Sequence, residues 1–385
     1  MKRYAQKLLA ALPRVVPREA LSSHPDVECY EQFGEPEVLS LPTPDLVLTT
    51  NPQWVLDNLA LWKPSWPRPF VCALSRARLI GPLFLGVTAA REVVLETTRT
   101  AGSDDLLWPK ATRQTLWNYL SACRKPTLTF ADGLWAPLFH VSQDSYFHWF
   151  CDVLPIVEAV RVMESNTGAR VKFIVSRPLS LWQQETLELV GVDLQDVVCW
   201  NDDSAYVPRL VVASVRTDGW TCLPSIAALR WIRGQVISRT SGGTPSPSLI
   251  YIRRVGRRRV GNDDAVTRLM ESRGIVPIEL ERMTVLEQVR LFQNARLIVA
   301  SHGAGLTNMI FSDNAQIIEL FGPWKSLCYA AIARGFGHRY VGLDMMPSAG
   351  FQQDALSRSR DFTVEIDMLA SSVDERLARV RRDGC

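Results

Sequence analysis

His148 and Asp152 lie four residues apart in the segment DSYFHWFCDVLP, Asp144–Pro155, which is the densest group of reactive side chains in the chain. On a helix, this spacing places both side chains on one face. A histidine beside a carboxylate can remove a proton from a hydroxyl group, because burial and the partner tune the pKa of the pair. The segment therefore predicts a catalytic proton acceptor. The alternative is a capped histidine buried inside an aromatic core.

A second group of reactive residues follows an apolar run. Leu297–Ala300 has the β-branched character of an interior parallel strand, and a glycine-rich turn follows it. A strand, such a turn and the start of a helix form an anion site, because free N–H groups and the helix dipole converge there. The alternative is a simple turn whose histidine bonds a backbone carbonyl. The predicted anion-binding residues are His302, Gly303, Ala304, Gly305, Leu306, Thr307 and Asn308.

Arginines crowd the carboxyl end of the strand predicted over 249–252. Ligands bind off the carboxyl ends of parallel strands, and the forked guanidinium group suits phosphate. Arg254 and Arg259 are therefore predicted to meet a phosphate, the alternative being a solvated basic loop. Glu319, in the strand predicted over 317–321, is placed to accept the two hydroxyls of a ribose or to pair with a neighbouring arginine.

Metal ligands are sparse in the sequence. No Asp-x-Asp pair is present to hold Mg²⁺ or Mn²⁺ against a diphosphate. The eight cysteines include no Cys-x-x-Cys pair, so their spacing suits neither a zinc site nor a disulfide framework. We therefore expect no metal and no cofactor, with leaving-group charge met by arginine, histidine and a helix dipole.

Alternating strands and helices must position these residues. The chain has 385 residues, which is long for one hydrophobic core, so two domains are expected. The linker Thr240–Ser248, TSGGTPSPS, separates them. Before it, strands are predicted at 171–175, 197–200 and 210–213. After it, strands are predicted at 249–252, 276–280, 297–300, 317–321 and 340–343, with helices between them.

This pattern predicts an α/β protein with two Rossmann-like domains facing a cleft. The expected divisions are a first domain over 1–239, a second, Rossmann-like domain over 248–363, and a helix over 364–385 that crosses back onto the first domain. A net charge of +3 is too small to indicate nucleic-acid binding. No segment approaches the roughly 18 apolar residues of a membrane span. The basic N-terminal stretch is interpreted as a short amphipathic helix, with peripheral membrane association as an alternative.

Three motifs resemble those of glycosyltransferase family 61, over roughly Tyr146 to Leu343. The first is SYFHWFCDVLP, the second is YIRRVGRRRVGND, and the third ends in the intact HGAGLTN. The residues that match the family pattern are His148, Trp149, Asp152, Pro155, Arg254, Arg259, Asn262, Glu287, Gln288, Ala295 and His302–Asn308. The departures are Ser145, Ile156, Arg253 and Asp263, where the family usually has Asn, Arg, Ser and Glu.

The resemblance implies a GT-B fold and an inverting transfer from a nucleotide-sugar donor to a glycan or lipid-linked glycan acceptor, and the missing Asp-x-Asp pair makes a metal-independent transfer the expectation. The donor is then held by Arg254, Arg259, Asn262, His302–Asn308 and Glu319. The base is expected to be Asp152, with His148 as the competing candidate or its orienting partner. The expected context is bacterial capsular or lipopolysaccharide assembly, in the cytoplasm or at the inner face of the membrane. The alternatives are a nucleotide-sugar hydrolase or epimerase of GT-B type and a non-catalytic glycan- or nucleotide-binding protein.

Overall fold

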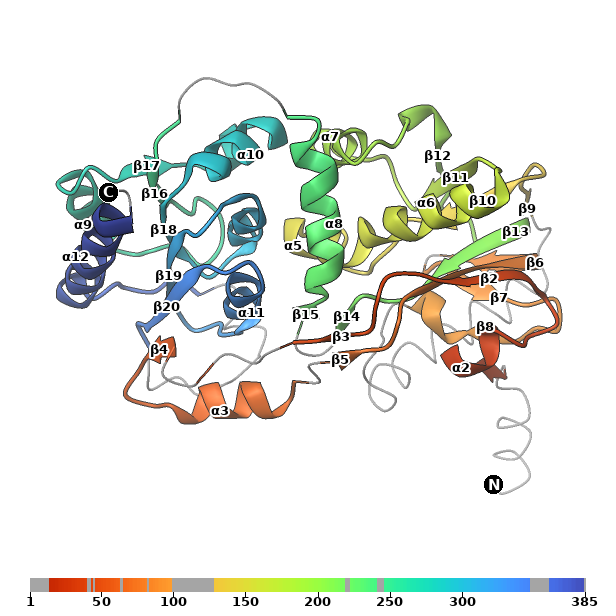
Figure 1. Ribbon diagram of the computed structural model, residues 1–385, viewed down its shortest axis with the longest axis horizontal. Coiled ribbons are helices and arrows are strands. Elements are labelled where there is room, and N and C mark those ends of the chain that lie inside the picture. Colours follow the sequence, from red (N-terminus) through yellow and green to blue (C-terminus); the bar gives the residue numbers. More distant parts are fainter. Residues whose placement is uncertain are drawn as a thin grey trace. The chain divides into compact units, whose positions relative to one another are not determined.

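The computed structural model describes residues 14–39, 43, 46–62, 65–81, 83–98, 128–218, 222–240, 246–346 and 360–383 (Figure 1). The chain forms two compact units. Unit 1 comprises Met1–Glu37 and Trp66–Ala228. Unit 2 comprises Val38–Ser65 and Leu229–Cys385.

Unit 1 is built on a ten-stranded mixed sheet with the main order β1-β8-β7-β6-β13-β10-β11-β12. Strands β13, β10, β11 and β12 are parallel neighbours, as the βαβ pattern predicts, whereas β6 pairs antiparallel with β13. The strands of this sheet are β1 (Val15–Val16), β2 (Val27–Gln32), β6 (Phe70–Ile80), β7 (Leu85–Val87), β8 (Val93–Val94), β9 (Leu128–Thr129), β10 (Leu134–Pro137), β11 (Val171–Val175), β12 (Val197–Cys199) and β13 (Ser204–Ala213). A separate two-stranded sheet contains β14 (Thr217–Asp218) and β15 (Leu223–Pro224).

The helices of unit 1 include the segment that carries His148 and Asp152. They are α2 (Arg18–Leu21), η2 (Leu95–Thr98), α5 (Tyr146–His148), the π-helix η3 (Trp149–Val153), α6 (Pro155–Thr167), α7 (Leu181–Leu189) and η4 (Leu194–Asp196). Helices α6 and α7 connect the parallel strands, so the Rossmann-like expectation describes this part of unit 1. The antiparallel half, built on β6, was not predicted.

Unit 2 is a six-stranded parallel sheet in the order β17-β16-β18-β19-β20-β4. Helices cover both faces of this sheet, α9 and α12 on one and α10 and α11 on the other (Figure 1). The strands are β4 (Val47–Leu48), β16 (Leu249–Ile252), β17 (Val276–Ile278), β18 (Leu297–Ser301), β19 (Gln316–Phe321) and β20 (Arg339–Asp344). The helices are α3 (Gln53–Ala60), α9 (Asp263–Glu271), η5 (Leu280–Arg282), α10 (Val285–Asn294), η6 (Ala304–Phe311), α11 (Cys328–Gly335) and α12 (Ile366–Asp383).

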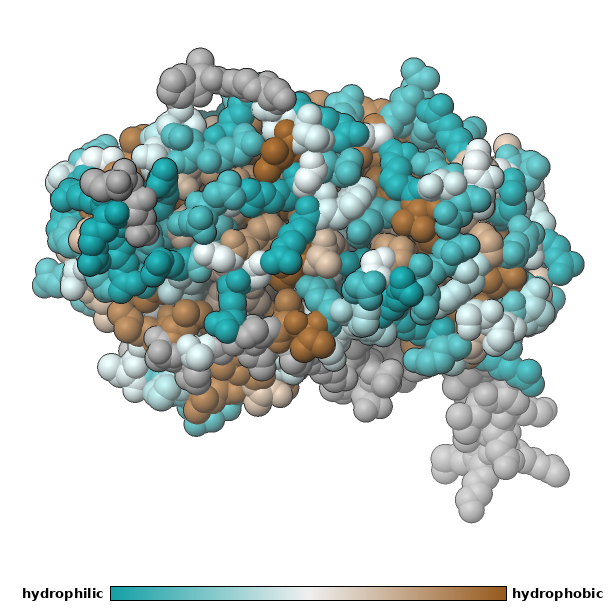
Figure 2. Space-filling model, in the orientation of Figure 1, coloured by the Kyte–Doolittle hydropathy of each residue, from teal (hydrophilic) through white to brown (hydrophobic). Residues whose placement is uncertain are grey.

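The chain passes between the units through β3 (Glu37–Val38), β5 (Ser65–Trp66) and α8 (Ile226–Ile237). Residues 38–65 belong to unit 2, whereas the sequence placed them in a domain over 1–239. The reason is that β4 extends the sheet at β20, and Trp54 and Thr49 donate hydrogen bonds to Asp344. Apolar side chains gather on the surface over α3, including the exposed Leu56 and Leu61 (Figure 2).

The C-terminal helix corrects another expectation. The sequence predicted that 364–385 crosses back onto the first domain, but α12 contacts α9, β18 and β19 of its own unit. Its apolar face explains this, because Leu369, Val373 and Leu377 complete the core on that side of the sheet. None of the described helices is both long and apolar enough to cross a lipid bilayer.

Candidate functional site

A local irregularity presents His148 and Asp152 in unit 1. Pro155 has no N–H to donate, and its ring crowds the carbonyl four residues earlier. The preceding turn widens into η3, and the N–H of Leu154 bonds the carbonyl of Trp149, five residues back. Such π-turns are frequent at functional sites. His148 ends α5 just before this turn, and Asp152 lies within it.

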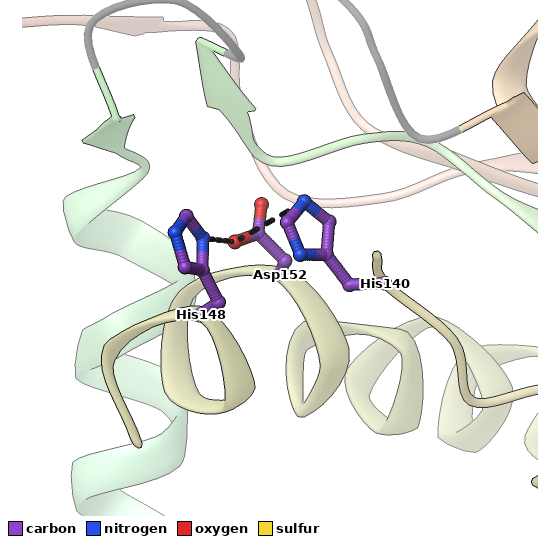
Figure 3. Close-up of side chains that lie close together, drawn as sticks. All are labelled: His140, His148 and Asp152. Carbon is purple, nitrogen blue, oxygen red and sulfur yellow. Dashed lines mark hydrogen bonds and ion pairs between the residues drawn. The ribbon is translucent and has the colours of Figure 1, made fainter. Parts of the chain in front are cut away.

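Asp152 is the centre of the group (Figure 3). Its Oδ2 lies 2.8 Å from Nδ1 of His148, and its Oδ1 accepts a hydrogen bond from the Thr217 hydroxyl. The residue is only 8 % exposed, whereas the side chain of His148 is 24 % exposed. Of the two predicted catalytic residues, His148 is therefore the one that a substrate can reach more readily.

His140 lies next to the His148–Asp152 pair. It was not predicted as a site residue from the sequence. Its Nε2 lies 4.0 Å from Oδ2 of Asp152, and its ring stacks on that of His148 with centroids 4.7 Å apart (Figure 3). The residue follows β10, at the carboxyl end of a parallel strand. That position was the available signal, because ligand-binding residues collect at such ends.

The carboxylate is held in its charged form. Burial alone would raise the pKa of Asp152, but the hydrogen bond from His148 and the proximity of His140 outweigh it, so the pKa lies below its usual value. An ionised Asp152 accepts a hydrogen bond from Nδ1–H of His148. Nε2 of His148 then carries a lone pair, and no hydrogen bond to it is formed within the described residues. This arrangement can take a proton from a hydroxyl group.

The same three side chains could hold a metal ion, since their ligand atoms lie within 4.8 Å of one another. The tautomer of His140 argues against it. The backbone N–H of Ser142 donates to Nδ1 of His140, 3.1 Å away, so the ring proton of neutral His140 is on Nε2. A metal ligand needs a lone pair on the nitrogen that faces the ion. The contacts therefore favour proton transfer.

Unit 2 contains the glycine-rich turn at the carboxyl end of β18. Two of its glycines are closely packed by side chains: a Cβ on Gly303 would lie 1.7 Å from Nη1 of Arg254, and one on Gly305 would lie 2.8 Å from Leu280. The helix that follows, as predicted, is the 3₁₀-helix η6. Its first amides have no intrahelical acceptor and can bind an anion.

Within the glycine-rich turn, only Ala304 and Gly305 are partly exposed. Leu306, Thr307 and Asn308 are buried, and the amide of Asn308 donates to Gln288, 2.8 Å away. These predicted binding residues thus anchor the turn to α10. His302 and Gly303 are buried at the end of β18, and Ala304 and Gly305 follow them.

Both carboxylate oxygens of Glu319 interact with side chains of the protein. Its Oε1 lies 2.5 Å from Nδ1 of His302, and its Oε2 accepts from the hydroxyl of Tyr340. The residue is fully buried, which corrects the expectation that it accepts ribose hydroxyls. Burial lowers the pKa of His302, assisted by the charges of Arg258 and Arg254 and opposed by Glu319. Burial likewise raises the pKa of Tyr340 well above its usual value.

The predicted donor-binding residues in the loop after β16 do not all reach the glycine-rich turn. Arg254 reaches the turn, where its Nη1 lies 3.2 Å from the carbonyl oxygen of His302. Arg259 turns outward and pairs with Asp361 at 3.1 Å, with its own side chain 61 % exposed. Asn262 precedes α9 and exchanges two hydrogen bonds with the backbone of Val364, so its amide is structural. Arg258, which was not selected from the sequence, lies near enough for its charge, like that of Arg254, to lower the pKa of His302.

Residues 146–318 match the family model described as Glycosyltransferase 61. This segment is a glycosyltransferase 61 domain. It includes His148, Asp152, Thr217, Arg254 and His302, so the matched segment carries residues of both groups. His140 precedes it and Glu319 follows its last residue.

Relatives of the glycosyltransferase 61 domain are transferases. An EGF domain-specific O-linked N-acetylglucosamine transferase of Drosophila melanogaster is 33 % identical over 92 residues, covering 23 % of this chain and 18 % of that protein. The beta-1,2-xylosyltransferase XAX1 of Oryza sativa subsp. japonica is 23 % identical over 273 residues, covering 63 % of this chain and 47 % of that protein. The chain thus spans less than half the length of these relatives.

A solved structure shows weak similarity. It is the bacterial iron-containing dodecameric glycosyltransferase TibC, with 9 % identity and a TM-score of 0.31, covering 68 % of this chain and 78 % of that one. At these values the comparison adds nothing to the assignment of the glycosyltransferase 61 domain.

Proposed function

We propose that the protein is a glycosyltransferase that moves a hexose or pentose from a nucleotide-sugar donor to a glycan acceptor. The observation that carries the proposal is the His148–Asp152 pair inside a glycosyltransferase 61 domain, with Nε2 of the more exposed imidazole able to accept a proton. Two α/β units with parallel strands are the components expected of a GT-B enzyme. The parallel sheet of unit 2 is the donor-binding half in this proposal.

The proposed reaction is one displacement at the anomeric carbon. The acceptor hydroxyl gives its proton to Nε2 of His148, and its oxygen forms the new glycosidic bond. The bond from the anomeric carbon to the donor phosphate breaks with its electrons on the nucleoside diphosphate. A single displacement inverts the configuration. Asp152 keeps its charge, holds the imidazole through Nδ1 and stabilises the imidazolium, as the carboxylate does in other histidine–aspartate pairs.

The departing diphosphate is neutralised by fixed charges and dipoles of the protein. Arg254 and the free amides at the start of η6 lie at the carboxyl end of β18. Glu319 orients His302 in the same place. Preorganised donors of this kind stabilise leaving-group charge without a metal. We therefore propose a metal-independent reaction, and His148, more than Asp152, as the base.

The test is a screen of UDP-, GDP-, CMP- and TDP-linked sugars by thermal shift, followed by transfer assays on the binders. A donor at about 100 times its Kd should raise the free energy of unfolding by about 2.7 kcal/mol. The anomeric configuration of the product, measured by NMR, checks inversion. If none of these donors stabilises the protein, the proposal fails. If a donor loses its sugar to water at the same rate with and without glycan acceptors, the protein is a hydrolase.

A further inference from the structure

The arginine-rich loop after β16 contains two kinds of arginine. Arg253 is neutralised by Asp263 at 2.6 Å and Glu279 at 3.2 Å, and Arg259 is neutralised by Asp361. Arg254 and Arg258 have no carboxylate partner within the described residues. Since charged groups that leave water are normally paired, the two unpaired arginines indicate a missing anion.

Arg254 lies across the glycine-rich turn. Its Nε donates to the carbonyl of Arg257 at 2.5 Å and its Nη1 to the carbonyl of His302 at 3.2 Å. Nη1 occupies the space where any side chain at Gly303 would begin. These contacts fix the guanidinium group against the backbone but leave its positive charge uncompensated.

Arg258 is brought to the same place by an unusual backbone conformation. Its φ of +61° lies in the left-handed region, which arginine seldom adopts, and such outliers collect at ligand sites. Its Nε is buried without a hydrogen-bond partner. Burial, followed by the charge of Arg254, lowers the pKa of Arg258 to about 10. The folded chain therefore holds two mutually repelling cations at one strand end.

The nearby acidic groups do not relieve this repulsion. Both carboxylate oxygens of Glu319 are engaged by His302 and Tyr340, and the charge of Glu281 raises the pKa of Arg254 less than burial lowers it. Two guanidinium groups next to the free amides of η6 are suited to a ligand with two adjacent anionic centres. A diphosphate has that charge distribution, and each phosphate can receive a forked guanidinium group.

We propose that Arg258, together with Arg254, binds the diphosphate of the donor, and that the family-motif residue Arg259 does not. This inference rests on the proposed function, because the donor is taken to be a nucleotide sugar. It changes which residue performs the binding: Arg259 keeps Asp361 and the adjoining chain in place, and Arg258 contacts the ligand. The backbone strain at Arg258 is then part of how the loop directs its side chain.

The experiment is calorimetric titration of the full chain with inorganic pyrophosphate, inorganic phosphate, and UDP, GDP, ADP and TDP. The variant is Arg258→Asn, because asparagine tolerates the left-handed conformation and removes only the guanidinium group. Arg257→Asn is the matched control, since it makes the same charge change in the same loop. Arg259→Asn tests the competing residue. Thermal unfolding of each unliganded variant accompanies the titrations.

We expect Arg258→Asn to weaken the binding of pyrophosphate and of the preferred nucleoside diphosphate roughly tenfold or more, the usual effect of losing a charged hydrogen bond. Its unliganded melting temperature should equal or exceed that of the wild type, because a repulsion is removed. Arg257→Asn and Arg259→Asn should bind as the wild type does. A merely structural arginine would instead lower the melting temperature.

The outcomes separate this inference from the proposed function. Nucleoside diphosphate binding that survives Arg258→Asn but is lost in Arg259→Asn overturns the assignment of Arg258 and leaves the function standing. Binding of pyrophosphate through Arg258 without binding of any nucleoside diphosphate supports the anion site and contradicts the nucleotide-sugar donor. If the wild type binds none of the probes, both fail.

Discussion

In unit 1, Asp152 holds His148 through Nδ1, and in unit 2, Glu319 holds His302 through the same ring nitrogen. The side chain of His148 is 24 % exposed, but that of His302 is only 8 % exposed. A hydroxyl and a second imidazole surround the first pair. Two uncompensated arginines and a glycine-rich turn surround the second.

The comparison shows that a histidine–carboxylate pair has no fixed task. Next to Asp152, an accessible imidazole can gain a proton from a substrate, and the carboxylate stabilises the resulting cation. Next to Glu319, a buried imidazole among positive charges is kept neutral, because its pKa is lowered. The second pair therefore serves to position groups around an anion. Charge in the surroundings, more than the pair itself, decides between a base and a binding site.

The largest expected effect is loss of transfer in unit 1. We expect His148→Ala to reduce kcat by roughly 10²- to 10⁴-fold, the usual contribution of a general base. Asp152→Asn should lose a comparable amount, because an amide can stabilise the wrong tautomer of His148. Both variants should bind the nucleoside diphosphate with wild-type affinity by calorimetry. Loss of binding in either variant would mean that this pair also shapes the donor site.

The relative effects of the two substitutions identify the base. If Asp152 is itself the base, as the sequence comparison suggested, His148→Ala should retain much of the activity and Asp152→Asn almost none. If His148 is the base, a small base such as imidazole added to His148→Ala should restore part of the rate. Asp152→Asn should not respond to the same addition.

A smaller effect is expected in unit 2, on binding. Glu319→Gln keeps the shape of the side chain but disturbs the hydrogen bond to His302, a loss of about 1–3 kcal/mol for a buried group. We expect weaker nucleoside diphosphate binding and lower thermal stability. At saturating donor, kcat should change much less than in the unit 1 variants. A kcat loss as large as that of His148→Ala would contradict the division of tasks.

The two pairs also differ in how far the sequence reveals them. His148 and Asp152 are neighbours on one helical stretch, so their spacing alone predicts the contact. Glu319 meets His302 because β18 and β19 are adjacent parallel strands, with Ala300 in register with Glu319. The hydrophobic pattern of the sequence predicted both strands. That Glu319 is the partner of His302, however, depends on how the two strands pair in the folded protein.

The remaining site residues depend on long-range contacts. Arg258 and Arg259 look alike in the sequence, and only Asp361, 102 positions after Arg259, distinguishes them. Thr217 bonds Asp152 from 65 residues away. Residues 38–65 belong to unit 2 because β4 pairs with the edge strand β20. No local sequence pattern predicts this pairing. By contrast, the alternating elements after residue 248 follow strong hydrophobic periods and were predicted nearly to their ends.

The next prediction concerns pH and stability. Because the pKa of folded His302 lies below 6.5, the unfolded chain binds more protons below about pH 6.5, and stability falls there as pH decreases. His338 contributes in the same direction. The pKa of Asp152 lies below 3.8, so the stability it supplies is lost only in more acidic solution. Each tenfold change in proton affinity corresponds to about 1.4 kcal/mol.

Thermal unfolding from pH 7.5 to 5 measures this difference. We expect His302→Gln to lose less stability than the wild type on acidification, with His338→Gln separating the contribution of the second buried histidine. An unchanged slope in His302→Gln would show that His302 is already protonated in the folded protein. The His148–Asp152 and His302–Glu319 pairs would then differ only in how exposed their histidine side chains are.

The smallest expected effect is that of chelation. Nδ1 of His140 accepts a hydrogen bond from the backbone N–H of Ser142, and this places the ring proton on Nε2, the nitrogen that faces Asp152. We therefore expect transfer to survive dialysis against EDTA, with no metal retained by elemental analysis. A requirement for a divalent ion, lost in His140→Ala, would instead make Asp152, His148 and His140 a metal centre. In that case the positive charge that stabilises the carboxylate of unit 1 would come from the ion, and the two pairs would differ in chemistry as well as in surroundings.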